Sequence, residues 1–188
     1  MNSNNKYFKK NVRLPIDDFF EDVLYNKNYG YYAKKNPFEK NGDFITSPSI
    51  SFLFGEMLAV WIVYFWESLG KPKKFNIVEL GPGNGKLSKH LLKTFKFFPE
   101  FKSSLNFFLL EKSSLLKNIQ KKSLEDYKVK WISNLKVLKK GPVLFFGNEF
   151  FDAIPIKQFK INSGKMLENY VSLDNSNKIK EILLKASL

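Results

Sequence analysis

The stretch from Phe75 to Gly85 constrains the fold of this 188-residue chain more than any other part of it. It reads Phe-Asn-Ile-Val-Glu-Leu-Gly-Pro-Gly-Asn-Gly, an apolar run followed by alternating glycines. The run predicts a buried strand, and the glycines predict a tight turn that a ligand can approach closely. A helix is expected from Lys86, and its first turn offers free N–H groups. This order of elements indicates a nucleotide-type cofactor site at the carboxyl end of a parallel sheet.

Two common phosphate-binding motifs do not match this turn. A P-loop needs a glycine, four further residues and then Gly-Lys-Ser/Thr, but positions 80 and 87 are both leucine. The dinucleotide fingerprint needs a third glycine at position 86, which is lysine. What remains is Glu79-x-Gly81-x-Gly83-x-Gly85, which suits S-adenosylmethionine because a carboxylate beside a glycine turn can bind its ammonium group. A turn with a purely structural role is the alternative.

Glu111 follows a second apolar run, from Leu105 to Leu110, which predicts another buried strand. A carboxylate at the end of such a strand can accept hydrogen bonds from both hydroxyls of a ribose. A solvated acid at a strand end is the alternative. Together with the glycine turn, the position of Glu111 favours a contact to the cofactor.

A third polar cluster, with Asn148, Glu149 and Asp152, follows the predicted strand from Val143 to Phe146. Ligands of open α/β sheets lie outside the carboxyl ends of the strands, so these side chains are expected beside the reactive end of the cofactor. Two carboxylates there could hold a guanidinium group by bidentate hydrogen bonds. A loop with incidental acidic residues is the alternative.

Strands alternate with helices through the middle of the chain, which predicts an α/β fold with a parallel sheet. Before it, a helix from Ser49 or Ser51 to about Leu69 is apolar nearly all round, so burial on most sides is expected. We predict a helical N-terminal extension with a substrate or lid loop at residues 1–72, and a partial cofactor-binding α/β domain at 73–188. A β-hairpin is expected from about residue 156.

Composition narrows the chemistry further. The chain has no cysteine and a single histidine, which excludes thiolate metal sites and a cysteine nucleophile, and no bound metal is expected. Its net charge of +13 comes almost entirely from scattered lysines, and this favours a compositional bias over a nucleic-acid site. No apolar segment reaches the length of about 20 residues that a membrane span needs.

Several motifs of the chain resemble those of the MidA family of class I S-adenosylmethionine-dependent methyltransferases. The resemblance covers roughly residues 14–160 in the family's order. The matching segments are Gly30–Tyr32, Gly42–Pro48, Phe54–Glu56, Val78–Gly85 and Asn148–Phe159. Family members are much longer, so the chain resembles an N-terminal portion, with a Rossmann-like methyltransferase sheet that is incomplete in this chain.

The resemblance implies arginine N-methylation of a partner protein, with a respiratory complex I subunit as the substrate in mitochondria. It implies a cytoplasmic location in bacteria and the mitochondrial matrix in eukaryotes. Glu79, Gly81, Gly83, Gly85 and Glu111 would then hold S-adenosylmethionine. The catalytic residues would be Asn148, Glu149 and Asp152. An RNA methyltransferase and a non-catalytic assembly or binding module remain the alternative functions.

Overall fold

The structure, a computed structural model, describes residues 12–38, 42–44, 51–138, 140–174, 176 and 178–186. The chain divides into two compact units, one made of residues 35–151 and the other of 1–34 with 152–188. Each unit is described by itself. The division into domains near residue 72 remains a prediction.

The unit of residues 35–151 contains a parallel sheet of the order β4-β3-β2-β5. Its elements are α4 (Phe52–Ser68), β2 (Phe75–Leu80), α5 (Lys86–Phe95), α6 (Pro99–Ser104), β3 (Leu105–Leu110), α7 (Ser114–Ser123), β4 (Val129–Ile132), the 3-10 helix η2 (Leu135–Val137) and β5 (Val143–Phe146). The predicted parallel α/β sheet is therefore confirmed. Helix α6 was not predicted from the sequence. It begins at Pro99, and proline is common in the first turn of a helix.

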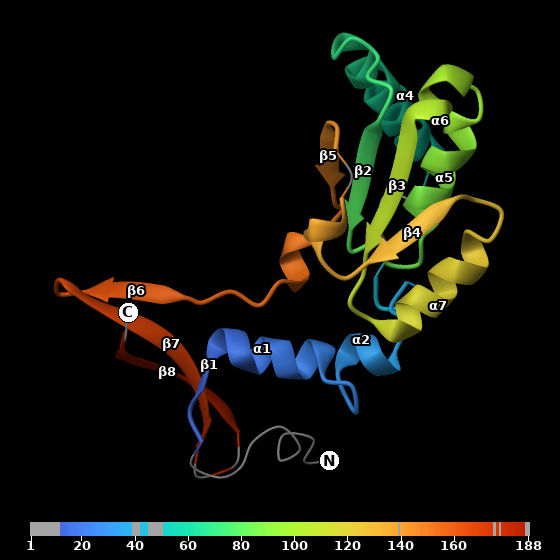
Figure 1. Cartoon of the computed structure of the whole chain (residues 1–188). Helices are drawn as coiled ribbons and strands as arrows, with labels where there is room; N and C mark the ends of the chain where they lie inside the picture. Colours follow the sequence, from blue (N-terminus) through green and yellow to red (C-terminus); the bar gives the residue numbers. More distant parts are fainter. Residues whose placement is uncertain are drawn as a thin grey trace. The chain divides into compact units, whose positions relative to one another are not determined.

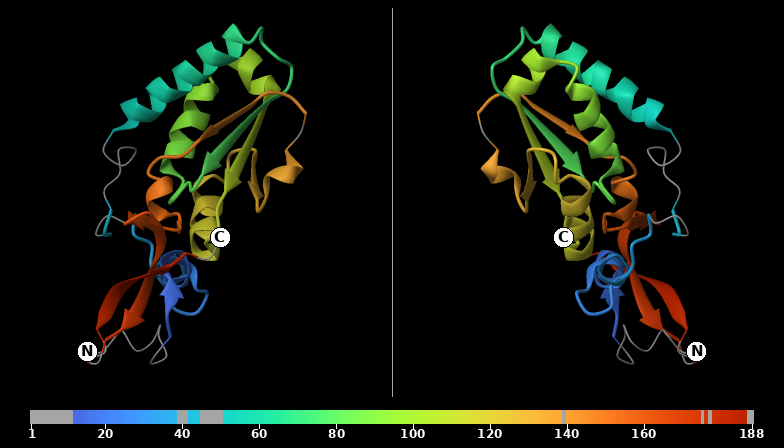
Figure 2. Two further views of the ribbon diagram at one scale, coloured as in Figure 1. Left: turned by 90° about the vertical axis from the view of Figure 1, so that its left-hand side faces the viewer. Right: turned by 90° about the vertical axis from the view of Figure 1, so that its right-hand side faces the viewer.

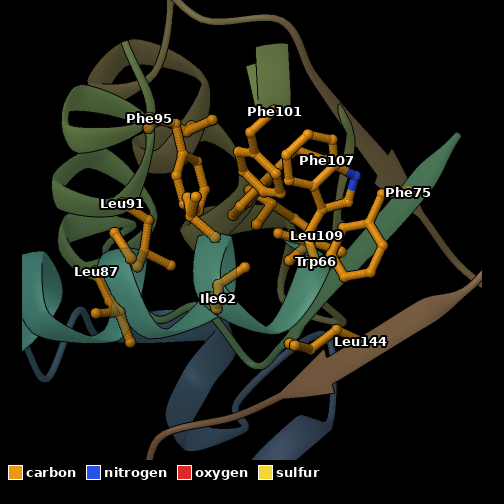
Figure 3. Packing of buried hydrophobic residues seen from close by; sticks show 14 of the residues in the cluster. Ile62, Trp66, Phe75, Leu87, Leu91, Phe95, Phe101, Phe107, Leu109 and Leu144 are labelled. Carbon is orange, nitrogen blue, oxygen red and sulfur yellow. The ribbon is translucent and has the colours of Figure 1, made fainter. Parts of the chain in front are cut away.

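The main core lies between one face of this sheet and α4, α5 and α6 (Figures 1 and 2). Successive side chains of a strand point to opposite faces of the sheet. Phe75 and Ile77 of β2 therefore face these helices, while Val78 faces the other side. Figure 3 shows aromatic and aliphatic side chains from the helices meeting those of the strands. The rings of Trp66 and Phe101 pack edge to face with their centroids 5.4 Å apart. This core fixes β2 and α5, the two elements that carry the glycine turn between them.

Gly55 allows α4 and α5 to approach each other closely. A Cβ atom at Gly55 would lie 2.6 Å from Cβ of His90, a separation at which the backbones must move apart. Gly55→Ala is therefore expected to lower the free energy of unfolding by about 2 kcal/mol, as overpacking does in well-packed cores. Urea unfolding would measure this loss. Glu56→Ala, at the exposed neighbouring position, is the control, and equal stability of the two variants would contradict the prediction.

The prediction that the helix before β2 is buried on most sides is wrong for this chain. Ser51 caps α4 as expected, and the side facing α5 is buried through Gly55, Ala59, Ile62, Val63 and Trp66. The other side exposes a row of large apolar side chains. These are Phe52, Leu53, Phe54, Met57, Val60, Trp61 and Tyr64. The elements of the described chain cover only one face of a helix whose sequence is apolar on both.

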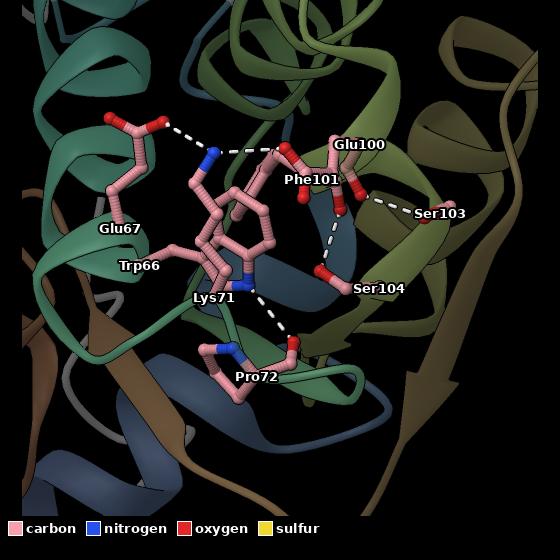
Figure 4. Close-up of polar contacts among 8 residues, drawn as sticks. All are labelled: Trp66, Glu67, Lys71, Pro72, Glu100, Phe101, Ser103 and Ser104. Carbon is pink, nitrogen blue, oxygen red and sulfur yellow. Dashed lines mark hydrogen bonds and ion pairs between the residues drawn. The ribbon is translucent and has the colours of Figure 1, made fainter.

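A set of polar contacts stabilises the connection between α4 and β2, which lies at the end of β2 far from the glycine turn (Figure 4). The indole Nε1–H of Trp66 donates a hydrogen bond of 3.0 Å to the carbonyl oxygen of Pro72. The ammonium group of Lys71 lies 3.3 Å from a carboxylate oxygen of Glu67 and 2.9 Å from one of Glu100. These contacts hold the start of the strand and are independent of the glycine turn.

The other unit is built on an antiparallel sheet in which β7 is central. Its elements are β1 (Leu14–Pro15), α1 (Ile16–Tyr25), α2 (Tyr31–Lys34), the 3-10 helix η3 (Phe151–Ala153), β6 (Phe159–Asn162), β7 (Lys165–Leu173) and β8 (Ile179–Lys185). Strands β6 and β7 form the predicted hairpin, and Ser163 and Gly164 make its turn with positive φ angles. Ile16 of α1 packs on Val171 of β7.

Parts of the N-terminal extension predicted at residues 1–72 lie outside the described residues. These parts are residues 1–11, 39–41 and 45–50, and they include most of the segment Gly42–Pro48. Within the described part of the chain, the helices are all too short or too polar to cross a membrane.

Candidate functional site

The turn after β2 has the backbone conformation that its glycines predict. Gly81, Gly83 and Gly85 have φ angles of 60°, 56° and 79°, which lie in the left-handed region that residues with a Cβ rarely adopt. The amide N–H of Gly81 donates to the carbonyl oxygen of Leu110 at 3.0 Å, so the turn is anchored to the end of β3. Gly85 forms the N-cap of α5. The turn therefore joins the carboxyl ends of two strands to the first turn of a helix.

Aromatic rings pack against this turn on two sides. A Cβ atom at Gly81 would lie 2.7 Å from the ring of Phe150, and one at Gly83 would lie 3.2 Å from the ring of Phe38. The amide Nδ2–H of Asn84 also donates to the carbonyl oxygen of Phe38 at 3.1 Å. Residues from before α4 and from after β5 thus meet at the glycine turn, at the edge of the sheet where a site is expected.

Glu79, the acidic residue at the end of β2, is buried, with 2% of its surface exposed. One of its carboxylate oxygens accepts a hydrogen bond from the hydroxyl of Ser88 on α5. Burial raises the pKa of Glu79 from 4.5 to about 7, the negative charge of Glu111 adds to the rise, and the Ser88 hydrogen bond opposes it. Glu79 therefore links β2 to α5 beneath the turn and carries a proton over much of the mildly acidic range.

Glu111 follows β3 directly and lies at the same edge of the sheet. Its Oε1 accepts a hydrogen bond of 2.8 Å from the backbone N–H of Ser113, and its Oε2 accepts one of 3.1 Å from the side-chain amide of Gln120. Burial raises the pKa of Glu111, while these hydrogen bonds and the charge of Lys117 lower it. The carboxylate is thus oriented by neighbours on α7, the helix that follows it.

Gln120 lies at this candidate site and was not predicted from the sequence. Its side-chain Nε2 donates both to the carbonyl oxygen of Gly83, at 2.8 Å, and to Glu111. The signal was present in the helical spacing, because Gln120 lies four residues after Leu116 and four before Leu124, and both leucines are buried. A polar residue on the buried face of an amphipathic helix needs partners, and here two of those partners are predicted site residues.

Only part of the polar cluster Asn148, Glu149 and Asp152 lies in the same unit as the glycine turn. The side-chain amide of Asn148 donates to Glu149 at 3.3 Å, and the next residue, Phe150, packs on Gly81. Glu149 is exposed and has a φ of 56°, a conformation that costs a non-glycine residue about 1–2 kcal/mol. Such strain is often found at functional sites. Asp152 lies in η3 and is the first residue after β5 that belongs to the other unit, so it is described with that unit alone.

The residues at this edge of the sheet fit S-adenosylmethionine. A carboxylate has about four lone-pair positions, so Glu111 keeps acceptor capacity for ribose hydroxyls beyond its bonds to Ser113 and Gln120. The glycine turn presents backbone without side chains, which suits the close approach of a nucleoside. The role expected for Glu79 is less direct, because its carboxyl group is buried against Ser88.

Comparison with known proteins gives the same fold. A crystal structure of a Burkholderia thailandensis protein bound to S-adenosyl-homocysteine superposes with a TM-score of 0.77 at 25% sequence identity, over 94% of this chain and 46% of that one. The match covers both the parallel sheet and the antiparallel sheet, and it confirms the predicted fold class.

Curated relatives share the sequence over most of this chain. The protein arginine methyltransferase NDUFAF7 homolog of Drosophila melanogaster is 31% identical over 89% of the chain and 43% of its own length. The mitochondrial protein arginine methyltransferase NDUFAF7 of Xenopus laevis is 33% identical over 80% of the chain and 40% of its own length. The chain thus spans less than half the length of these relatives.

A family description also matches most of the chain. Residues 57–187 match the family described as "Putative S-adenosyl-L-methionine-dependent methyltransferase". That range includes the glycine turn, Glu111 and the cluster after β5. The chain therefore belongs to this family of methyltransferases, the MidA family that its motifs resemble, and S-adenosylmethionine is the family's cofactor.

Proposed function

We propose that this chain binds S-adenosylmethionine at the glycine turn after β2 and uses it to methylate an arginine of a partner protein. The observation that carries the cofactor site is the hydrogen-bonded connection of the turn to Glu111, through the bond from Gly81 to Leu110 and through the amide of Gln120. In this proposal Gly81, Gly83, Gly85 and Glu111 contact the cofactor, and Glu79 supports the turn from below.

The proposed substrate group is a guanidinium, and Asn148, Glu149 and Asp152 would bind it. When bound, S-adenosylmethionine supplies a methyl group on a positively charged sulfur. The carboxylates would fix the guanidinium by bidentate hydrogen bonds and aim one of its nitrogens at that methyl group. Catalysis would then depend mainly on positioning. The curated relatives are named as protein arginine methyltransferases, which supports an arginine substrate. The resemblance to the MidA family supports a respiratory complex I subunit as the partner.

Glu149→Gln tests this assignment. The neutral amide keeps the shape of the side chain but loses a charged hydrogen bond to the guanidinium, which is worth about 2 kcal/mol. Methyl transfer to an arginine-containing protein substrate is expected to slow about 30-fold, while the affinity for S-adenosylmethionine stays unchanged. Transfer of a labelled methyl group and calorimetric titration measure the two quantities. Unchanged transfer in Glu149→Gln and in Asp152→Asn would reject the assignment.

A non-catalytic assembly or binding module is the second candidate, and the exposed apolar row on α4 favours it. Large exposed apolar patches often mark protein–protein contacts. This candidate predicts that a partner protein still binds when Glu149 and Asp152 are both replaced, and that no methyl transfer occurs. Loss of partner binding in that double variant would favour the enzymatic function instead.

A further inference from the structure

The side-chain amide of Gln120 joins three separate elements inside the unit of residues 35–151. It extends from α7 to the glycine turn at Gly83, to Glu111 at the end of β3, and to Trp131 on β4. Gln120 has no exposed surface. A buried amide stabilises a fold only when its donors and acceptor are satisfied, and these partners satisfy each of its polar atoms.

Trp131 determines which way the amide faces. Its indole Nε1–H donates a hydrogen bond of 2.9 Å to Oε1 of Gln120. Indole nitrogen is a donor only, so it must meet the oxygen and not the nitrogen of the amide. The Nε2 group is therefore held toward two acceptors, the carbonyl oxygen of Gly83 at 2.8 Å and Oε2 of Glu111 at 3.1 Å.

In this arrangement the planar amide of Gln120 links the glycine turn to the carboxylate of Glu111. Gly83 and Glu111 lie on different strand–helix connections, and Nε2 of Gln120 contacts both. When a ligand contacts the turn and the carboxylate at the same time, its affinity depends on the distance between these two groups. Errors of about 1 Å in such an arrangement are costly for binding and for reaction geometry.

We propose that Gln120 is a positioning residue for the adenosyl cofactor, holding Glu111 at the distance from the glycine turn at which its carboxylate accepts the ribose hydroxyls. Trp131 is the second part of this device, because it fixes the orientation of the amide. The inference rests on the proposed cofactor site. Gln120 acts through Glu111 and touches no reacting atom.

A purely structural role for Gln120 predicts a different result. If its hydrogen bonds only stabilised the fold, its loss would weaken all ligands of the site alike or none of them. A positioning role makes the loss depend on the ribose hydroxyls. The two roles can be separated by removing the amide and a ribose hydroxyl singly and together, as in a double-mutant cycle.

The test is a calorimetric titration of wild type and Gln120→Met with S-adenosylmethionine and with its 3′-deoxyribose analogue. Methionine has a similar length and fills the space without donating hydrogen bonds. We expect Gln120→Met to weaken binding of S-adenosylmethionine about tenfold, the value of one charge-assisted hydrogen bond, and binding of the deoxy analogue less than about threefold. Equal losses for both ligands, or no loss for either, would overturn the inference.

Trp131→Phe provides a second variant that leaves Gln120 in place. It removes the indole N–H and keeps an aromatic ring, so that the amide is free to turn. An affinity loss of about threefold for S-adenosylmethionine is expected, again larger than for the deoxy analogue. If Gln120→Met does not fold, Trp131→Phe tests the inference in its place. Unchanged affinity of Trp131→Phe for S-adenosylmethionine would then reject the inference.

Trp66→Phe is the matched control. It removes another buried indole hydrogen bond, the one to Pro72 at the far end of β2 (Figure 4). We expect a loss of stability with unchanged affinity for both ligands.

The affinity of the wild type for S-adenosylmethionine separates a failure of the proposed cofactor site from a failure of the inference about Gln120. If the wild type does not bind S-adenosylmethionine, the proposed cofactor site is rejected together with the inference, whereas binding that is insensitive to Gln120 rejects the inference alone.

Discussion

Glu79→Gln is expected to flatten the dependence of folding stability on pH between about pH 4.5 and pH 7. The folded-state pKa of Glu79 is raised from 4.5 to about 7, chiefly by burial. In this window the unfolded chain loses the proton of Glu79 while the folded chain keeps it, so the wild type becomes less stable as the pH rises. A shift of this size corresponds to about 3 kcal/mol, and glutamine has no proton to lose.

Urea unfolding at a series of pH values from 4 to 8 measures this effect. Below about pH 4.5 the carboxyl group is protonated in both states and Glu79 contributes no pH dependence. Above about pH 7 it is ionised in both states and the difference between variant and wild type becomes constant. Glu125→Gln makes the same chemical change at an exposed position and is the control. A pH dependence in Glu79→Gln as steep as that of the wild type would contradict the assignment of a buried, protonated carboxyl group.

Gly83→Val is expected to weaken binding of S-adenosylmethionine at least about 100-fold. Gly83 has a φ of 56°, and a β-branched residue there is under strain of about 1–3 kcal/mol. Its first side-chain carbon would also lie 3.2 Å from the ring of Phe38, which requires the ring or the turn to move. A displaced turn would lose its bond from Gln120 and its alignment with Glu111. Calorimetric titration measures the affinity.

Gly70→Val is the matched control for this substitution. Gly70 also has a positive φ, 79°, but no atom would lie within 4 Å of an added Cβ, and it follows α4 at the end of β2 far from the turn. The same backbone strain is therefore introduced without disturbing the site. We expect Gly70→Val to lower stability and to leave the affinity unchanged. If Gly83→Val bound the cofactor as the wild type does, the glycine turn would not be the cofactor site.

The elements that carry the site could be predicted because their signals are local. The apolar run of β2, the glycines after it and the start of α5 at Lys86 lie within a single short stretch of sequence. Each signal reflects a property of the residue itself, such as the freedom of glycine to take a positive φ. The strand before Glu111 and the hairpin from about residue 156 were predicted on the same basis.

The burial of α4 could not be predicted in the same way. Its sequence is apolar on both faces, and burial on most sides was the physical expectation. Which face is covered depends on which elements pack against it, and within the described chain α5 and the sheet cover only one. The close fit of Gly55 to His90 marks that face. Nothing in the local pattern distinguishes it from the face that carries Trp61 and Tyr64.

The strand, the glycine turn, the helix and the acidic residues after neighbouring strands can all be predicted from local sequence, because they depend on backbone freedom and on the spacing of apolar residues along a continuous stretch. The use of the acidic residues depends instead on how the chain packs. The tertiary structure buries Glu79 against Ser88, orients Glu111 with the amide of Gln120, and joins both strand ends at one edge of the sheet. These contacts connect residues far apart in the chain, and a hydrogen bond depends on distances that exist only once the strands and helices have packed.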